Sequence, residues 1–438
     1  MFLYIKKNNI TKFYLVASYF FIILSLGANL AYIEQINFAE KIFKTENINK
    51  FRGVLPFIIL IINILIILKI KINFRKHEYL LIGLILSYLF GTFNNKIDYI
   101  NIFKLHFIIT PVALITTLAI SRKLKELRNQ VTFFYVLFFF FITVLILFYS
   151  QNNIGYGGGY ISFFKEQIIF INSNGISRIS CFIYFLLICG LIKNKSYFDF
   201  KSIFISTLSV FLGSLIILSE GRVNISIILL STLLIFLNTK INFYKKTIFF
   251  FLVIFLSFML SNILKLTEVK KIKFDNRFED IKIENTLRQN INKYFETDVN
   301  KIKTGRFAKW KDLITYTKSL DLKTTLLGKG PETDRQVLQN LGYMWNADSA
   351  NSFFYSLLCG GLIGLFFYLR IIVLLLLNFK NFLLNKKQLI NESLYNIFFS
   401  VFPIMLLLRS LFENSISSWS LDFIIMITCL NYFYLKRN

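Results

Sequence analysis

Charged residues are scarce in this chain. They make up 17% of its 438 residues, whereas hydrophobic residues make up 55% and the mean hydropathy is +0.59. Soluble domains carry about 25% charged residues, so this composition excludes a soluble enzyme, a disordered chain and a coiled coil. The sequence also lacks the apolar–polar alternation over about 10 residues that is typical of outer-membrane barrel strands. Its apolar residues instead form runs of about 16–22 residues, the length of a helix that crosses a bilayer.

Cysteine, histidine and acidic clusters are equally sparse. The four cysteines all fall inside apolar runs, and the two histidines, His77 and His106, are far apart. We therefore expect neither a disulfide nor a metal site. His77, among lysines and an arginine, is expected to be a solvated loop residue. His106, near the outer end of the fourth span, either borders a site or has the structural role that is more common for a lone histidine. The sequence has no Asp-x-Asp motif and no acidic cluster outside the apolar runs, so we expect a metal-independent protein without a cofactor.

The apolar runs predict an all-α polytopic membrane protein with about 12 transmembrane helices and a large, partly helical extracytoplasmic loop. The first run is flanked by lysines like a signal peptide, but many further runs follow, and we expect it to be an uncleaved first helix. The predicted spans are 13–33, 54–70, 79–93, 102–120, 131–149, 176–192, 202–219, 223–238, 246–263, 352–377, 393–412 and 416–434. They define three parts: helices 1–9 in residues 1–263, the large loop in 264–351, and helices 10–12 in 352–438.

The distribution of Lys and Arg predicts the orientation. The net charge is +26, and the excess lies in the short segments on the same side as the N-terminus. Because basic residues in short loops stay in the cytoplasm, we expect both termini to be cytoplasmic and segment 264–351 to lie outside.

With this topology, four polar clusters fall on the outer face. They are the Gly-rich loop 150–165 leading to Asn172, Asn174 and Arg178; the turn Ser219-Glu220-Gly221-Arg222; the loop 264–351; and Arg409 with Glu413. Ionisable groups at membrane depth cost about 2.5–3.5 kcal/mol, so their convergence favours a shared site. Taken singly, Arg222 also fits an arginine that reaches lipid head groups from a tight turn. Arg178 calls for an anionic partner, either a glutamate or a phosphate.

The large loop contains a predicted amphipathic helix. Phe307, Trp310, Leu313, Ile314 and Thr317 share one helical face, with Thr304 as its expected N-cap. Arg306 falls in the first turn, where the helix dipole disfavours a cation. That placement is a mild indication of function, although a helix resting on the membrane surface fits the pattern too.

Further polar motifs lead into the tenth span. Gly328-Lys329-Gly330-Pro331 predicts a tight turn without the ending of a phosphate-binding loop. Asp348 is expected at the membrane boundary, as the N-cap of the tenth span, as a general base, or as both. Glycines 360, 361 and 364 indicate close helix packing. Arg409 and Glu413 are four residues apart and are expected to form an intrahelical ion pair that could hold Arg409 ready for a phosphate.

Several motifs of the second half occur in a fixed order. They are the Ser-x-Gly-Arg-like turn at 219–222, Gly305-Arg306-x-x-x-Trp310, Leu327-Gly328-Lys329-Gly330-Pro331, Asp348-Ser349-Ala350-Asn351-Ser352-Phe353-Phe354 before Gly360-Gly361-Leu362-Ile363-Gly364, and Arg409-Ser410-Leu411-Phe412-Glu413. In this order and spacing the chain resembles the O-antigen polymerase and O-antigen ligase superfamily of bacterial envelope glycosyltransferases. Ligases of that superfamily typically carry a His where this chain has Ala350, so the resemblance favours the polymerase branch.

The resemblance implies a glycosyltransferase of the bacterial inner membrane that polymerises oligosaccharide repeat units carried on undecaprenyl diphosphate. Arg178, Arg222, Arg306 and Arg409 are then expected to bind the diphosphate, because a guanidinium offers planar, bidentate donors. Arg306 and Arg222 are also the expected catalytic arginines, with Asp348 first and Glu220 second as base, and with Trp310, Asn351 and Glu413 in support. The implied partners are membrane lipid, a chain-length regulator and a flippase of the same pathway. An O-antigen ligase and a flippase or transporter remain the alternatives.

Overall fold

The computed structural model describes residues 13–23, 32–33, 45–94, 105–123, 154–157, 160–163, 169–193, 200–218, 222–238, 243–266, 306–343, 349–384, 394–417 and 419–437. The described chain is mainly helical, as the sequence predicted. A helix over Phe13–Ile23 comes first. The labelled helices are α4 (Thr45–Ile70), α5 (Lys76–Asn94), α7 (His106–Lys123), α9 (Ser173–Lys193), α10 (Phe200–Leu218), α11 (Arg222–Asn238), α12 (Phe243–Leu266), α14 (Arg306–Lys318), α15 (Leu322–Leu327), α16 (Thr333–Asn340), α17 (Ser352–Leu384), α18 (Leu394–Ser410) and α19 (Leu421–Arg437).

The predicted apolar runs coincide with these helices. The run 79–93 lies within α5, 176–192 within α9 and 223–238 within α11, for example. Only part of the predicted span 13–33 is helical in the described residues, and the span 131–149 lies outside them. Long apolar runs form helices because a helix satisfies every interior backbone group within the segment.

The all-α expectation needs one correction, because a small antiparallel sheet joins residues 32–33, at the end of the first predicted span, to strands that follow the fifth. Its strands are β1 (Tyr32–Ile33), β2 (Ile154–Gly157), β3 (Tyr160–Phe163) and β4 (Ile169–Asn172), in the order β1-β4-β3-β2. Two residues, Gly158 and Gly159, separate β2 from β3, whose facing ends pair Gly157 with Tyr160. A Gly-Gly pair between apolar stretches is a hairpin signal, so part of the predicted Gly-rich loop is a hairpin.

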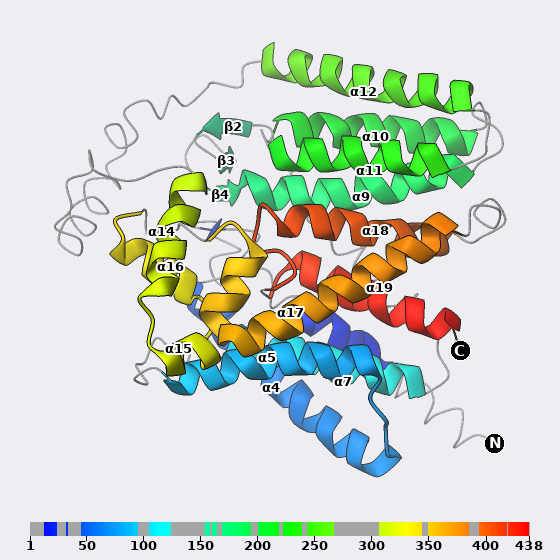
Figure 1. Ribbon diagram of the computed structural model, residues 1–438. Coiled ribbons are helices and arrows are strands. Elements are labelled where there is room, and N and C mark those ends of the chain that lie inside the picture. The colour runs from blue at the N-terminus through cyan, green and yellow to red at the C-terminus, as the bar shows by residue number, and fades with distance from the viewer. Residues whose placement is uncertain are drawn as a thin grey trace, which may run out of the picture.

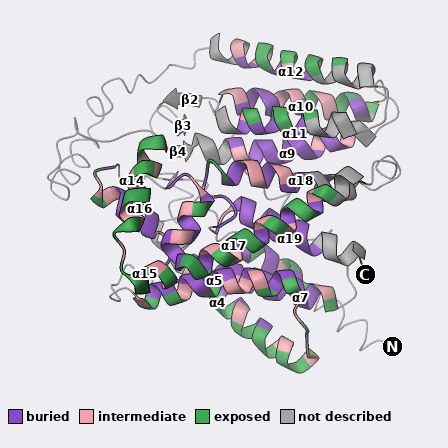
Figure 2. Cartoon of the chain, viewed as in Figure 1, coloured by how far each residue is buried: buried purple, intermediate pink, exposed green. Residues whose placement is uncertain are grey.

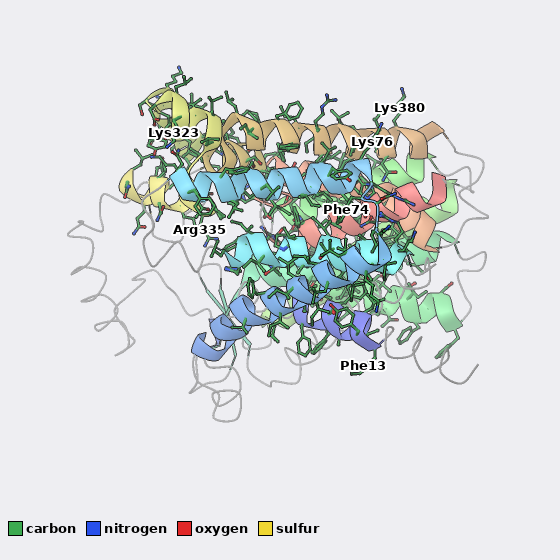
Figure 3. The ribbon with its side chains drawn as sticks, turned by 90° about the horizontal axis from the view of Figure 1, so that it is seen from below. Phe13, Phe74, Lys76, Lys323, Arg335 and Lys380 are labelled. Carbon is green, nitrogen blue, oxygen red and sulfur yellow. The ribbon has the colours of Figure 1, made fainter. Side chains whose placement is uncertain are left out.

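Most of the helices run in roughly the same direction, with α4 and α17 tilted, so the bundle has two opposite ends (Figure 1). One end holds the strands, α14, α15 and α16, and we call it the polar end. Lys323 and Arg335 lie there, whereas Lys76 and Lys380 lie at the opposite end, which we call the basic end (Figure 3). The helices alternate in direction: α17 leads away from the polar end, α18 returns to it, and α19 leads away again.

Exposed residues lie along the outside of α4, α12 and α17 (Figure 2), and many of them are large and apolar. On α12 they are Phe251, Leu252, Phe255, Leu256, Phe258 and Met259, all exposed. Small polar side chains are buried inside instead: Asn63 of α4 donates to Thr116 and Thr117 of α7 at 3.0 and 2.8 Å. Soluble monomers rarely expose contiguous apolar surface on this scale.

By length and composition, one described helical stretch, Ser352–Lys380 of α17, is long and apolar enough to cross a membrane, and several shorter apolar helices accompany it. This stretch is not a straight rod. Gly361 has φ 62° and ψ −159°, so α17 breaks there into two helical segments. The peptide N–H groups of Lys329 and Gly330 donate to the carbonyl oxygens of Leu358 and Cys359, both at 2.9 Å. The predicted tight turn at 328–331 therefore satisfies carbonyls just before the break.

Close packing by glycine in this region was predicted and is confirmed. A side chain at Gly360 or Gly364 would collide with Ser87 of α5, and one at Gly91 of α5 would collide with the carbonyl oxygen of Cys359. Only glycine lets α5, α17 and the turn approach so closely. The segment 306–343 is thereby seated directly on the bundle.

Replacing Gly361 with Ala should destabilise the protein strongly. The new Cβ would lie 2.2 Å from the carbonyl oxygen of Leu326, and the backbone conformation is one that essentially only glycine adopts. Gly342→Ala is the matched control, because Gly342 also has a positive φ but has no atom within 4 Å of the added Cβ. We expect Gly361→Ala to lose about 2–3 kcal/mol more than the control, measured by thermal unfolding in detergent. Equal losses would contradict the close approach.

Candidate polar site

The predicted site residues are unevenly placed by the structure. Arg178, Arg306, Trp310, Asn351, Arg409 and Glu413 are described and belong to segments at the polar end. Arg222 begins α11, but its side chain is outside the described set, and Asp348 and Glu220 lie outside the described residues. Asn172 ends β4, and Asn174 is in the first turn of α9.

Two segments interlock at the centre of the polar end: residues 349–352, which enter α17, and residues 411–415, which follow α18. Asn414 accepts from the hydroxyl of Ser349 at 2.6 Å and from the peptide N–H of Asn351 at 3.0 Å. The hydroxyl of Ser352 donates to the carbonyl of Glu413 and accepts from the N–H of Ser415, both at 3.0 Å. This network fixes the entrance of α17 against the end of α18.

Asp334 of α16 ties a third segment to this interlock. Its carboxylate, fully buried, accepts from the N–H of Ser349 at 2.8 Å and from the side-chain amide of Asn414 at 2.9 Å. A buried carboxylate is tolerated only with such donors. Asp334 therefore positions the segment 306–343 over the start of α17 and the end of α18.

The N-cap of α17 is Asn351. Its side-chain oxygen accepts from the N–H of Phe353 at 2.8 Å and of Phe354 at 3.4 Å, and its amide donates to the carbonyl of Leu411 at 3.0 Å. This finding corrects the expected capping role of Asp348, because the interlock starts the helix at Ser352, directly after Asn351. The supporting role of Asn351 in the site stays a prediction. Ala350, which directly precedes Asn351, is buried and has a φ of 47°.

The ion pairs differ from the predicted intrahelical one. Arg178 of α9 pairs with Glu413, and Arg409 pairs with Asp422 of α19 at 2.6 Å. The expected Arg409–Glu413 pair is thus replaced by two pairs between elements, because α18 ends at Ser410 and the chain turns before Glu413. Each arginine finds its carboxylate on another part of the fold.

The two arginines differ in access. The side chain of Arg178 is 25% exposed. The side chains of Arg409 and Asp422 are 3% and 0% exposed. A phosphate could approach Arg178 from the polar end, whereas Arg409 is enclosed and already neutralised. This geometry argues for a structural role of Arg409 in place of the expected diphosphate contact.

The predicted amphipathic helix is present as α14, with Arg306 as its first residue and partly exposed. Its apolar face packs only in part: Leu313 is buried, whereas Phe307 is 82% exposed. Trp310 donates from Nε1 to the carbonyl of Ser349 at 2.9 Å. Trp310 therefore links α14 to the interlock.

A small apolar core holds α14 and α16 on α17. Its buried residues are Leu313, Val337, Leu338, Tyr343 and Leu358. The hydroxyl of Tyr343 donates to Asp312 at 3.0 Å. Burial and this carboxylate raise the pKa of Tyr343 to about 12, so the phenol stays a neutral donor at physiological pH. The core and this hydrogen bond hold α14 and the residues after α16 against α17.

Sequence reasoning missed Asp334, Asn414 and Asp422. A signal existed for Asp422, which is an acidic residue inside the predicted span 416–434. Asp334 and Asn414 gave none, because their partners are 15 and 80 residues away along the chain. Among the residues that the structure describes, no three His, Cys, Asp or Glu side chains gather as a metal site, and metal independence stays a prediction.

Comparison with known proteins returned nothing: no family model, no curated protein and no solved structure matches the chain. The resemblance drawn from the sequence rests on its motifs alone.

Proposed function

We propose that the chain is a multi-pass protein of the bacterial inner membrane, with about 12 transmembrane helices, the polar end outside and both termini in the cytoplasm. The exposed apolar side chains on α4, α12 and α17 support this placement. The alternating direction of the helices also supports it, because consecutive membrane-spanning helices must cross the bilayer in opposite directions. Segment 264–351 supplies α14–α16 and is the outer loop of this topology.

At this outer face, we propose, the chain polymerises oligosaccharide repeat units carried on undecaprenyl diphosphate into O-antigen or capsule polysaccharide. The growing chain moves from its lipid diphosphate to a sugar hydroxyl of a new repeat unit. Negative charge develops on the departing diphosphate, and positioned guanidinium groups stabilise it. Proposed partners are a chain-length regulator and a flippase of the same pathway.

One observation carries this proposal: Arg178 is a partly exposed arginine at the polar end of an otherwise apolar bundle, and Glu413 is its partner. A diphosphate, like a carboxylate, presents two oxygens to the two parallel N–H donors of a guanidinium, and it carries more negative charge. We propose that the substrate replaces Glu413 on Arg178, and that Arg306 and Arg222 approach the diphosphate from α14 and from the start of α11.

The test is to delete the gene and examine surface polysaccharide on a gel, with the wild-type gene restored as the control. The proposal requires products with a single repeat unit in the deletion strain. Unchanged long polymer would contradict it. Undecorated lipid A-core together with accumulating lipid-linked polymer would indicate the ligase. Ala350, at the place of the ligase histidine, favours the polymerase.

A transporter of lipid-linked sugar is the second candidate, and the break in α17 favours it. Broken helices line the substrate sites of many transporters, where their free backbone groups bind the cargo. Here the carbonyl oxygens of Leu358 and Cys359 before Gly361 accept from the turn at 328–331, so they already have partners. We therefore keep the polymerase as the proposed function. Repeat units trapped on the cytoplasmic side in the deletion strain would reverse this choice.

Asp348 remains the first candidate for the base that accepts the acceptor proton, and Glu220 the second. General-base assistance contributes typically 10²–10⁴-fold. Since Asn351 is the N-cap of α17, Asp348→Asn should leave the helix intact and lower chain extension by about 10²-fold or more. The measurement is extension of lipid-linked repeat units by purified protein. Near-normal extension would exclude Asp348 as the base, and Glu220→Gln would be measured next.

A further inference from the structure

At the basic end, a second group of charges lies along residues 71–75 between α4 and α5, in the first turn of α5 and in the last turn of α7. We call it the basic corner: Lys71, Arg75, Lys76, Arg122 and Lys123, with Glu78 as the acidic residue among them. Lys71, Lys76 and Lys123 are exposed, and Glu78 is fully buried. The corner is at the opposite end of the bundle from the candidate polar site, as Lys76 shows (Figure 3).

Both oxygens of Glu78 are already in use. Oε1 pairs with Nη1 of Arg122 at 2.5 Å, and Oε2 accepts from the peptide N–H of Arg75 at 2.7 Å. The second bond is the backward half of a capping box at the start of α5. Arg122 also donates from Nη2 to the carbonyl of Asn73 at 2.8 Å. Glu78 therefore neutralises Arg122 and caps α5.

The guanidinium of Arg75 is left in an unfavourable position. Its Nη1 is buried and has no hydrogen-bond partner among the described residues. Burial lowers the pKa of Arg75, the positive charge of Arg122 lowers it further, and the negative charge of Glu78 raises it in part. A half-buried guanidinium beside a second one calls for an anion, and a phosphate matches its donors.

The position of the corner relative to the apolar outer surface indicates what kind of phosphate compound would bind there. Leu68, three residues before Lys71, is 71% exposed, and Tyr79, three residues after Lys76, is exposed as well. The apolar outer surface thus ends within one helical turn of the lysines, and tyrosine is typical of the membrane–water interface. An anion bound at this level lies where phospholipid head groups lie.

We propose that the basic corner binds the phosphate group of one anionic phospholipid of the cytoplasmic leaflet, held by Arg75 and the neighbouring lysines. The site clamps α4, α5 and α7 together at the end opposite to the polar site. This proposal rests on the membrane placement in the proposed function and not on the transfer reaction. The gel pattern of the deletion strain tests the transfer reaction, whereas the binding measurements below test the phospholipid site. Either proposal can therefore be contradicted without the other.

The test uses the full-length protein in mild detergent, and thermal unfolding with dioctanoyl phosphatidylglycerol, dioctanoyl phosphatidylcholine or inorganic phosphate at matched concentration. A ligand of the folded state raises the melting temperature. We expect phosphatidylglycerol to raise it by about 3 °C, and the other two to raise it by much less. An equal shift with phosphatidylcholine would overturn the proposal. An equal shift with inorganic phosphate would also overturn it, in favour of a soluble anion.

Arg75→Gln removes the guanidinium and should abolish most of the shift. Lys380→Gln is the matched control, because Lys380 is an exposed cation at the basic end but outside the corner (Figure 3), and it should keep the shift. A full shift in Arg75→Gln would contradict the site. A second measurement needs no variant: native mass spectrometry from nanodiscs of equal phosphatidylglycerol and phosphatidylcholine should show retained phosphatidylglycerol, and equal retention of both lipids would overturn the proposal.

Discussion

Replacing Arg178 with Gln is expected to lower chain extension by about 10²–10³-fold, the usual loss when a charge-stabilising donor is removed. Arg178 is partly exposed at the polar end, and Glu413 is its ion-pair partner. Arg178→Lys keeps the charge but loses the planar fork, so its extension rate should lie between those of the Gln variant and the wild type. Purified protein and lipid-linked repeat units give the measurement.

A control separates catalysis from folding. Arg178→Gln leaves the buried carboxylate of Glu413 without its partner, which by itself destabilises the protein. The double variant Arg178→Gln/Glu413→Gln removes both charges and should regain stability while extension stays low. If extension returned in the double variant, the role of Arg178 would be to neutralise Glu413, and the diphosphate contact would be excluded.

Breaking the buried pair of Arg409 and Asp422 should have the largest effect on stability. Arg409→Met leaves the carboxylate of Asp422 uncompensated among buried residues. Such losses are about 3–5 kcal/mol, and we expect them in thermal or denaturant unfolding of the purified protein. Lys380→Gln, an exposed change on α17, is the reference and should change stability by less than about 0.5 kcal/mol.

The double variant Arg409→Met/Asp422→Val tests the structural role. Replacing a buried ion pair by apolar residues is often neutral or stabilising, so the double variant should recover most of the lost stability. Because neither side chain is exposed, its chain extension should match that of the wild type. A folded double variant with extension reduced by about 10²-fold would restore Arg409 to the diphosphate site.

The helical segments were predictable because hydropathy is a local property. The runs 79–93 and 223–238 carry their length and polarity in the sequence itself, and α5 and α11 cover both. The amphipathic helix at 306 was predictable for the same reason. Its docking was not, because Leu313 is buried while Phe307 is exposed, and this difference depends on where α16 and α17 lie.

The pairing of charges was not predictable. Sequence spacing indicates which residues share a face of one helix, and on that basis Arg409 and Glu413 were paired. The partners in the structure, Asp422 and Arg178, come from other elements. The sheet was missed in a similar way, because β1 pairs with β4 across more than a hundred residues.

The cap of α17 shows a further limit. Asp348 and Asn351 are both good capping residues, and only two residues lie between them. The choice of Asn351 follows from contacts that Asp334 and Asn414 make with the segment 349–351. The break at Gly361 likewise depends on a distant turn, at 328–331, that approaches α17. Glycines inside an apolar run indicate close packing but not which neighbour approaches.

Accessibility from outside the membrane tests the central claim most directly. Lys323 of α15 and Lys380 of α17 are exposed at opposite ends of the bundle (Figure 3). In a background without the four native cysteines, Lys323→Cys and Lys380→Cys are each treated with a membrane-impermeant maleimide on intact spheroplasts. The proposed topology predicts labelling at 323, with labelling at 380 only after lysis. Labelling at 380 on intact spheroplasts, with 323 protected until lysis, would place the polar end in the cytoplasm and contradict the account.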